Sequence, residues 1–187
     1  MNRLKRKWWY IVTQVFYKMK FGKIGKGSIV FAPLQIDEMN SIALGEKVYI
    51  AQGAWLMGNA DEKETITIGN GTTIGHFSHI IGRHSITIEQ DVLIADKVFI
   101  SDCTHNYEDV NIPVSLQGIK SISPVRIGNG SWIGENVCIC GASIGKHCII
   151  GANSVVNKDI PDYCVAVGSP AKVVKKYDFK AQDWVKV

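Results

Sequence analysis

The sequence lacks any apolar run that approaches the roughly 20 residues a membrane-spanning helix requires. It also lacks a signal-peptide cleavage site: Gln14 and Lys18 interrupt the first apolar segment, and no small-residue site follows. The five cysteines are odd in number, and Cys138, Cys140 and Cys148 fit positions where a small packing residue is expected. These features favour reduced thiols over a disulfide framework and predict a cytoplasmic location.

Acidic residues are absent until Asp37, whereas eight Lys or Arg residues lie within 1–26. The net charge of +4 is therefore mild overall and concentrated at the N-terminus. No nucleic-acid partner is expected. At 187 residues with 46% hydrophobic content, the chain should form one domain with a substantial core.

A six-residue period runs through most of residues 24–161 and is clearest between Ile88 and His105. Three consecutive hexads begin there with Ile88, Ile94 and Ile100, and each has a compact residue at its fifth position. A fixed period of this kind is typical of a repeat architecture.

Aliphatic residues six apart cannot share one face of an α-helix, because six residues turn by about 600° at 3.6 residues per turn. They can all point inward if each hexad is a short strand plus a tight corner, so that three hexads make one triangular coil. Stacked coils would pair as parallel strands about 4.8 Å apart, with Gly, Asn and Asp at the corners. A β-sandwich would need period-two alternation, which is absent. The sequence predicts an all-β fold, a parallel β-helix over residues 24–177.

Residues 1–23 are predicted as a basic amphipathic helix. Between residues 3 and 20, apolar side chains recur at three- and four-residue spacing, namely Leu4, Trp8, Ile11, Val12, Val15, Phe16 and Met19. Such a helix can cap the open end of a repeat and hide its first edge. Alternatively, residues 1–20 can make a peripheral contact with the inner face of an anionic membrane. The two roles are compatible.

The period is interrupted by an acidic excursion at residues 59–64 and by one long insertion at residues 106–124. The long insertion follows His105 directly and has no periodicity. A loop of this length suggests a flap over a functional site. Residues 178–187 are expected to form a tail with a short C-terminal helix.

Four segments resemble the hexapeptide-repeat acetyltransferases, in particular the O-acetyltransferases of bacterial O-antigen, capsule and exopolysaccharide gene clusters: Phe99–His105, Pro124–Asn136, Ile150–Pro161 and Val167–Lys172. The resemblance implies a left-handed β-helix, a handedness that the period alone does not fix. It also implies a homotrimer whose active sites lie between neighbouring β-helices. The implied reaction is direct transfer from acetyl-CoA to a sugar hydroxyl of a cell-surface polysaccharide or its lipid-linked precursor.

The sequence departs from the family pattern at two places. Cys103 stands two positions before His105, where many relatives have a histidine or an aromatic residue. The turn at residues 139–144 is one residue shorter than in relatives, at the place where the resemblance expects the pantetheine arm of the cofactor. The contacts of residues 141–143 with the cofactor therefore stay open.

Acetyl transfer to a sugar needs a general base, because an alcohol is a poor nucleophile near neutral pH. His105 suits this role, since imidazole ordinarily titrates near 6.5 and the resemblance points to the same residue. The alternative is a surface histidine at a coil corner. Asp102 is expected either to orient the imidazole or bind substrate, or to be a solvated corner residue. His79 ends an earlier hexad at the same position as His105 and is expected to line the acceptor cleft.

The resemblance places acetyl-CoA along small, polar and aromatic residues, namely Trp132, Gly134, Glu135, Gly151, Ala152, Asn157, Lys158, Pro170 and Lys172. The small residues would let an extended cofactor lie close to the backbone, and the lysines would face its phosphates. Trp132 could equally be a packing anchor.

Three other functions share part of this pattern. A sugar N-acetyltransferase has the same hexads, which do not reveal the acceptor atom. A non-catalytic β-helix protein would not need His105, the long insertion or the lysine motifs. A zinc carbonic anhydrase of γ type would need a third histidine well upstream of His79 and His84, and the sequence has none before His76. No metal is therefore expected.

Overall fold

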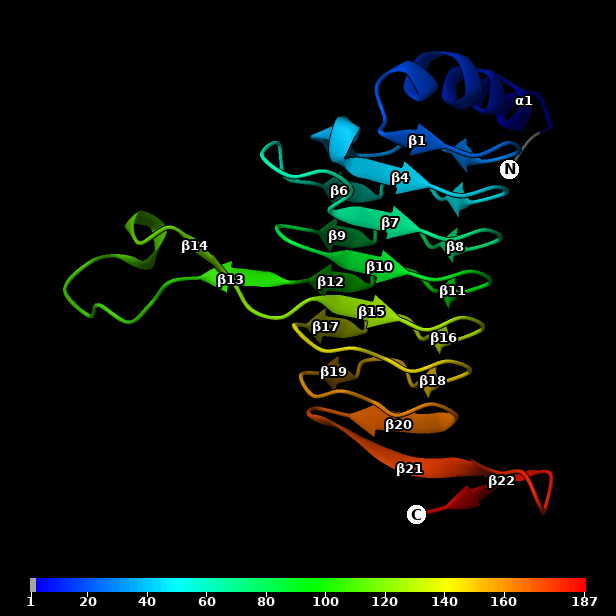
Figure 1. Ribbon diagram of the computed structural model, residues 1–187, viewed down its shortest axis with the longest axis vertical. Helices are drawn as coiled ribbons and strands as arrows, with labels where there is room; N and C mark the ends of the chain where they lie inside the picture. Colours follow the sequence, from blue (N-terminus) through cyan, green and yellow to red (C-terminus); the bar gives the residue numbers. More distant parts are fainter. Residues whose placement is uncertain (1–2) are drawn as a thin grey trace.

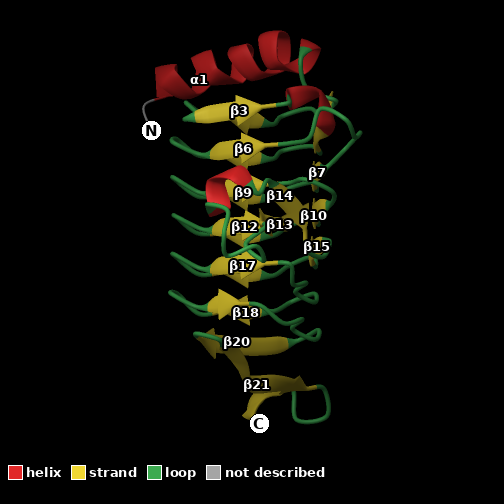
Figure 2. Cartoon of the chain, turned by 90° about the vertical axis from the view of Figure 1, so that its left-hand side faces the viewer, coloured by secondary structure: helices red, strands yellow, loops and turns green. Residues whose placement is uncertain are grey.

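Short strands and tight corners wind the chain into a stack of triangular coils, as the six-residue period predicts (Figures 1 and 2). The computed structural model describes residues 3–187. Met1 and Asn2, which the sequence assigns to the N-terminal helix, lie outside the described residues. The strands of successive coils pair in parallel and form three faces, called A, B and C below.

The faces consist of strands that are mostly two or three residues long. Face A contains β1 (Lys23–Ile24), β4 (Ile42–Leu44), β7 (Ile66–Ile68), β10 (Ile86–Ile88) and β15 (Val125–Ile127). Face B contains β2 (Ile29–Val30), β5 (Tyr49–Ile50), β8 (Thr73–Ile74), β11 (Leu93–Ile94), β16 (Trp132–Ile133), β18 (Ile149–Ile150) and β20 (Cys164–Gly168). Face C contains β3 (Gln35–Asp37), β6 (Trp55–Met57), β9 (His79–Ile81), β12 (Phe99–Ser101), β17 (Cys138–Cys140) and β19 (Val155–Val156).

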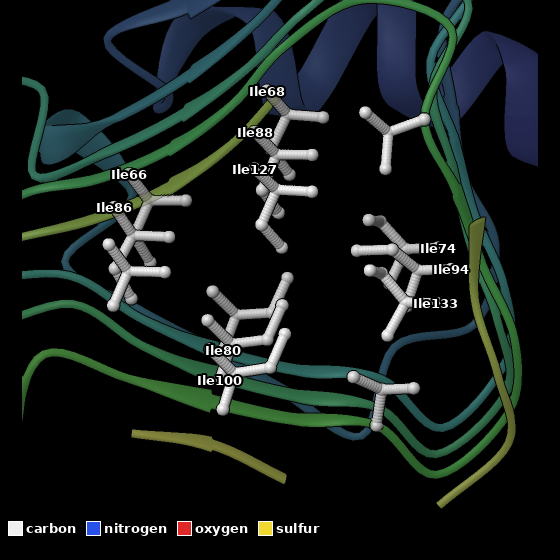
Figure 3. Packing of buried hydrophobic residues seen from close by; sticks show 14 of the residues in the cluster. Ile66, Ile68, Ile74, Ile80, Ile86, Ile88, Ile94, Ile100, Ile127 and Ile133 are labelled. Atoms are coloured by element: carbon white, nitrogen blue, oxygen red, sulfur yellow. The ribbon is translucent and has the colours of Figure 1, made fainter. Parts of the chain in front are cut away.

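Inward-facing isoleucines form rows that run through the stack (Figure 3). The register pairs place each side chain above its counterpart, as for Ile80 and Ile100 on face C or Ile74 and Ile94 on face B. These side chains are fully buried. Because burying one isoleucine contributes about 1.5–3 kcal/mol, the rows supply the main driving force for the fold.

Many corner residues adopt left-handed backbone conformations. The sequence predicts Gly, Asn and Asp at these corners, but larger residues also occupy them. Phe77 and Lys97 both have φ of 57°. Contacts between coils hold this conformation, since the Phe77 amide donates to the Gln52 carbonyl at 3.1 Å and the Lys97 amide donates to the His76 carbonyl at 2.7 Å. Such bonds offset the roughly 1–2 kcal/mol that a non-glycine residue loses in this region.

The N-terminal helix lies across one end of the stack (Figures 1 and 2). It begins as α1 (Arg3–Ile11), widens into a π-helical turn, η1 (Val12–Phe16), and ends in a 3-10 turn, η2 (Tyr17–Met19). Thr13 is buried against the first coil, and its hydroxyl accepts a hydrogen bond from the Val30 amide at 2.9 Å. Within residues 3–187, no helix combines the length and hydrophobicity needed to cross a bilayer.

The long insertion is more regular than the sequence predicts. Strand β13 (Cys103–His105) pairs antiparallel with β14 (Ile119–Ser121), so residues 103–121 form a hairpin arm that projects from the stack (Figure 1). A 3-10 turn, η4 (Val114–Leu116), lies near its tip. Another short 3-10 turn, η3 (Met39–Ser41), precedes β4.

The prediction of a short C-terminal helix is wrong. Strand β20 is followed by β21 (Ala171–Asp178) and β22 (Asp183–Lys186), which pair antiparallel and cover the last coil. Tyr177 contacts Phe179 and Trp184 edge-on, with ring centroids 5.1 and 5.4 Å apart. These aromatic contacts favour a hairpin, because cross-strand aromatic pairs stabilise antiparallel strands.

Candidate active site

His105 is the last residue of β13 and lies where the hairpin arm leaves the stack. Its side chain is exposed, and within residues 3–187 its ring forms no hydrogen bond or ion pair. His105 pairs with Ile119 across the arm. The histidine is therefore not at a coil corner, and it does not occupy the position in the stack that its hexad phase suggests.

A pocket of about 260 Å³ lies on the outer side of face C, next to the base of the arm. Its lining includes His79, His105, Trp55, Phe99 and Ile119. Three coils contribute, because Trp55, His79 and Phe99 are register partners on β6, β9 and β12. The structure thus brings the predicted base and the predicted acceptor-cleft histidine to one cavity.

The sequence did not identify the apolar walls of this pocket. Trp55 contacts His79 edge-on, with ring centroids 5.4 Å apart, and its indole N–H donates to Asp37 at 3.0 Å. These contacts fix the orientation of the wall beside His79. The available signal was the hexad position shared by Trp55, His79 and Phe99, which places all three on one outward-facing row.

The structure places Asp102 inside the stack rather than at a solvated corner. Its carboxylate is fully buried and accepts hydrogen bonds from the backbone amides of Arg83, His84 and Ser85 at 2.7, 2.8 and 2.6 Å. Hydrogen bonds to an ionised group are worth about 1.5–3 kcal/mol each, so this carboxylate ties the start of the arm to the preceding coil. Asp102 is therefore not a solvated corner residue, and its roles in orienting the imidazole or binding substrate stay predictions.

Three thiols lie beside the pocket. Cys103 lines it, and Cys138 and Cys140 lie below Phe99 and Ser101 on the next coil. Burial, together with the neighbouring Cys138 thiol, raises the pKa of Cys140 to about 12. Cys138 and Cys140 face outward, unlike the packing positions predicted for them, whereas Cys148 is buried. All five cysteines of the chain carry free thiols.

The hairpin arm does not fold over the pocket as a flap would. It extends away from the stack, and Ile119 is the arm residue beyond His105 that lines the cavity among residues 3–187 (Figure 1). The arm exposes Val110 and Leu116, whose residue exposures are 92% and 75%. The arm therefore contributes only its base to the pocket and exposes apolar side chains farther out.

Several predicted cofactor residues form a column at the corner between faces B and C. The Gly134 amide donates to the Ile150 carbonyl at 2.9 Å, and the Gly151 amide donates to the Ala166 carbonyl at 2.9 Å, so three successive coils stack there. A Cβ atom on Gly134 would lie 2.7 Å from the Ala152 backbone nitrogen. The stacking of coils is therefore enough to explain a glycine at position 134, even without a bound cofactor.

Exposed side chains surround this column. Trp132 is 49% exposed, so within the single chain it is not a packing anchor. Glu135 forms an ion pair with Lys97 at 3.0 Å. Ala152 is exposed on the next coil. Pro170 lies in the turn between β20 and β21, and Lys172 is exposed on β21.

Asn157 and Lys158 lie on a different corner, because they follow β19 on face C. Both side chains are exposed. Among residues 3–187, neither Lys158 nor Lys172 forms an ion pair, which leaves both cations available for a phosphate. Within the described chain, none of the predicted cofactor residues lines the pocket of His79 and His105. Over the same residues, no group of His, Cys, Asp or Glu side chains is arranged to hold a metal ion.

Residues 124–158 match the family model described as bacterial transferase hexapeptide (six repeats). The chain is 35% identical over 184 residues to the putative lipopolysaccharide biosynthesis O-acetyl transferase WbbJ of Escherichia coli K12, covering 94% of this chain and 89% of the relative. The chain belongs to the hexapeptide-repeat acetyltransferases. A second family member, galactoside O-acetyltransferase of the same organism, is 31% identical over 151 residues, covering 77% of this chain and 71% of the relative.

Solved structures confirm the predicted left-handed parallel β-helix. A mutant of AntD, an N-acyltransferase from Bacillus cereus, superposes with a TM-score of 0.76 at 22% identity, covering 90% of this chain and 91% of that chain. That structure contains dTDP-4-amino-4,6-dideoxyglucose and coenzyme A. A hexapeptide-repeat acetyltransferase of Vibrio cholerae, solved with acetyl coenzyme A, superposes with a TM-score of 0.64 at 21% identity, covering 94% and 87% of the two chains. The activity class follows from the named relatives at 31–35% identity, which make this chain an acyltransferase.

Proposed function

We propose that this acetyltransferase transfers an acetyl group from acetyl-CoA to a sugar hydroxyl of a cell-surface polysaccharide or its lipid-linked precursor. The observation that carries the proposal is the pocket in which His79 and the exposed ring of His105 meet. The 35% identity to a putative lipopolysaccharide O-acetyl transferase supports a saccharide acceptor.

In the proposed reaction, His105 accepts the proton of the sugar hydroxyl while the hydroxyl oxygen attacks the thioester carbonyl. The carbon–sulfur bond then breaks, and the proton on His105 passes to the departing thiolate. A positioned base of this kind contributes about 10²–10⁴-fold to turnover. His79 would hold the acceptor, because its ring lies on the same pocket wall and is kept in place by Trp55.

The residues available for acetyl-CoA fit an extended, anionic molecule. The corner column of Gly134, Gly151 and Ala152 presents little side-chain bulk, and Trp132 offers an exposed ring beside it. Lys158 and Lys172 would face the phosphates of the cofactor. Glu135, Asn157 and Pro170 complete the proposed set. The thioester supplies the activated acetyl group.

We further propose a homotrimer with active sites between neighbouring β-helices. Two features support it: the pocket lies on the outer surface of the stack, and the arm that projects from the stack exposes Val110 and Leu116. A neighbouring chain would cover the arm and bring a cofactor column next to the pocket. Sedimentation equilibrium should give three times the chain mass, and a fully active monomer would contradict the proposal.

The proposal includes a cytoplasmic enzyme with a peripheral contact between its N-terminal helix and the inner face of the membrane. The five free thiols are compatible with a reducing compartment. The lipid-linked form of the acceptor would be found at that membrane surface.

The decisive experiment replaces His105 with alanine. Turnover on a sugar acceptor should fall by about 10²–10⁴-fold, while the KM for acetyl-CoA and the melting temperature should change little, because His105 is exposed and lies outside the core. The matched control is His84→Ala, which removes an exposed histidine paired with Glu62 at 3.3 Å. Near-normal turnover in a well-folded His105→Ala protein would reject the assignment, and His79→Ala would be the next variant to measure.

The alternative acceptor is an amino-sugar nitrogen, favoured by the superposition on AntD, which is an N-acyltransferase. The two products differ chemically, because an acetyl ester is cleaved by mild hydroxylamine whereas an acetamide resists it. Mass spectrometry of the saccharide before and after this treatment separates them. A product that keeps its acetyl group would establish N-acetylation.

A further inference from the structure

The N-terminal helix leaves an apolar stripe on its outer side. Trp8, Ile11, Val15 and Met19 follow each other at three- and four-residue spacing and are all exposed, Trp8 at 61% and Met19 at 76%. They are not the residues that fix the helix to the stack. The apolar side chains that the sequence predicts to cover the end of the stack therefore lie only partly against it.

Other positions of the helix make the contacts with the first coil. Trp9 packs edge-on against Phe31, with ring centroids 5.9 Å apart. The Gln14 side-chain amide donates to the carbonyls of Gly25 and Ser28 at 3.1 and 3.0 Å. Because Trp9 and the buried Thr13 lie on a different side of the helix from the stripe, the helix is held in place while the stripe stays open to its surroundings.

A basic cleft lies between the helix and the first coils. Two adjoining pockets of about 410 and 380 Å³ share Arg6, Gly27 and Ile29 in their lining. The charged and hydroxyl-bearing side chains around them, which define the basic cleft, are Arg3, Arg6, Lys7, Tyr10, Lys47 and Tyr49. Within residues 3–187, no carboxylate lines either pocket.

The cations of the basic cleft differ from three cations on the coil stack that have acidic partners. Lys97, Arg126 and Lys146 each form an ion pair with an acidic side chain on the stack. Among the described residues, the four Lys and Arg side chains of the cleft form none. Burial raises the pKa of the Tyr49 hydroxyl, and the positive charge of Arg6 opposes the rise, as expected for side chains that are close together.

We propose that the N-terminal end of the molecule is a docking surface for an anionic phospholipid bilayer, in which the stripe enters the interface and the basic cleft binds a headgroup phosphate. An exposed apolar stripe beside unpaired cations is the pattern of a helix that lies in the plane of a membrane surface. Each cation near an anionic surface adds about 1 kcal/mol of attraction. This inference makes the membrane contact of the proposed function specific. It rests on the proposed function only for the identity of the acceptor.

The proposal fixes the orientation of the enzyme. With α1 flat on the membrane, the coil stack would point away from the bilayer, because the helix lies across its end (Figures 1 and 2). The pocket strands β6, β9 and β12 follow β3 on face C in consecutive coils. Three steps of about 4.8 Å place β12 roughly 15 Å beyond β3. The catalytic pocket would then act on a saccharide that extends from its lipid anchor.

Flotation of the full-length protein with vesicles tests the proposal without measuring turnover. Vesicles of phosphatidylcholine with about one third phosphatidylglycerol should bind the protein at least tenfold more strongly than pure phosphatidylcholine vesicles. The double variant Trp8→Glu/Val15→Glu should reduce binding at least tenfold, whereas Val185→Glu/Val187→Glu, which also replaces two exposed apolar residues but at the other end of the molecule, should not. Arg6→Glu/Lys47→Glu should also lose binding, whereas Lys186→Glu at the other end of the molecule should keep it.

Three results would overturn the proposal. One is equal binding to neutral and anionic vesicles. Another is a protein that binds inorganic phosphate through Arg6 and Lys47 but does not float with anionic vesicles, which would make the cleft a site for a free anion. The third is lipid-independent self-association that Trp8→Glu/Val15→Glu abolishes, which would assign the stripe to a second copy of the chain. Melting temperatures of all variants should match the unsubstituted protein, and a failure of flotation alone would leave the acetyl-transfer proposal intact.

Discussion

Strands β12 and β13 are separated by a single residue, yet they differ in strand pairing and in burial. Strand β12 pairs with neighbours on both sides of face C, and its central residue Ile100 is fully buried. Strand β13 pairs only with β14 among the described strands, and its last residue His105 is exposed. The comparison shows that pairing within the stack ends at Ser101, after which the chain leaves the stack and exposes the His105 side chain.

The largest expected difference between the two strands is in stability. Ile100→Ala removes a fully buried side chain from an isoleucine row that cannot collapse easily, because the rows above and below are held by the coil register. We expect a loss of about 2–5 kcal/mol in the free energy of unfolding, measured by urea denaturation. His105→Ala should leave that free energy within about 0.5 kcal/mol of the unsubstituted protein. Equal destabilisation by both changes would show that the arm is part of the folded core.

Asp102 joins the two strands, and its replacement should have an intermediate effect. Asp102→Asn keeps the shape of the side chain but replaces one accepting oxygen with a donor, which then meets the backbone amides of Arg83, His84 and Ser85. The expected cost is about 1–3 kcal/mol in unfolding free energy. Turnover should also fall because the base of the arm would shift.

The control for this change is Asp61→Asn, which alters an exposed acid in the loop at residues 59–64. It should leave stability and turnover unaltered. If Asp102→Asn lowered turnover with no loss of stability, the carboxylate would have a direct role at the site, as the sequence analysis considered.

The sequence predicted the interior of the stack well because coil packing depends on local repetition. Ile88, Ile94 and Ile100 need only a six-residue spacing to be placed inside. The same reasoning could not place Asp102, since its partners at residues 83–85 lie on the previous coil and their amides carry no sequence signal. It also missed the arm strands and the C-terminal hairpin, which depend on pairing between specific segments rather than on the period.

The candidate site was predictable only in part for a related reason. His105 was identified from its place before the long insertion together with the family resemblance, His79 from its matching hexad position, and the structure brings both to one pocket. Predicting that Trp55 and Phe99 form the walls required knowledge of the register between coils. The positions of residues within hexads do not reveal that register. The proposed cofactor residues came from the family resemblance, and within residues 3–187 they do not line this pocket.

The smallest expected effect concerns the proposed cofactor residues, which lie on the stack and the C-terminal hairpin rather than on the arm. Lys172→Glu should raise the KM for acetyl-CoA by about two- to fivefold at low salt, because an exposed charge contact is worth at most about 1 kcal/mol. The increase should shrink towards 1 M salt, where the screening length falls to about 3 Å. Turnover at saturating acetyl-CoA should stay unchanged, in contrast to His105→Ala. The matched control is Lys175→Glu, an exposed lysine on the same strand that is not assigned to the cofactor. A KM that is the same for both variants at every ionic strength would exclude Lys172 from the cofactor site.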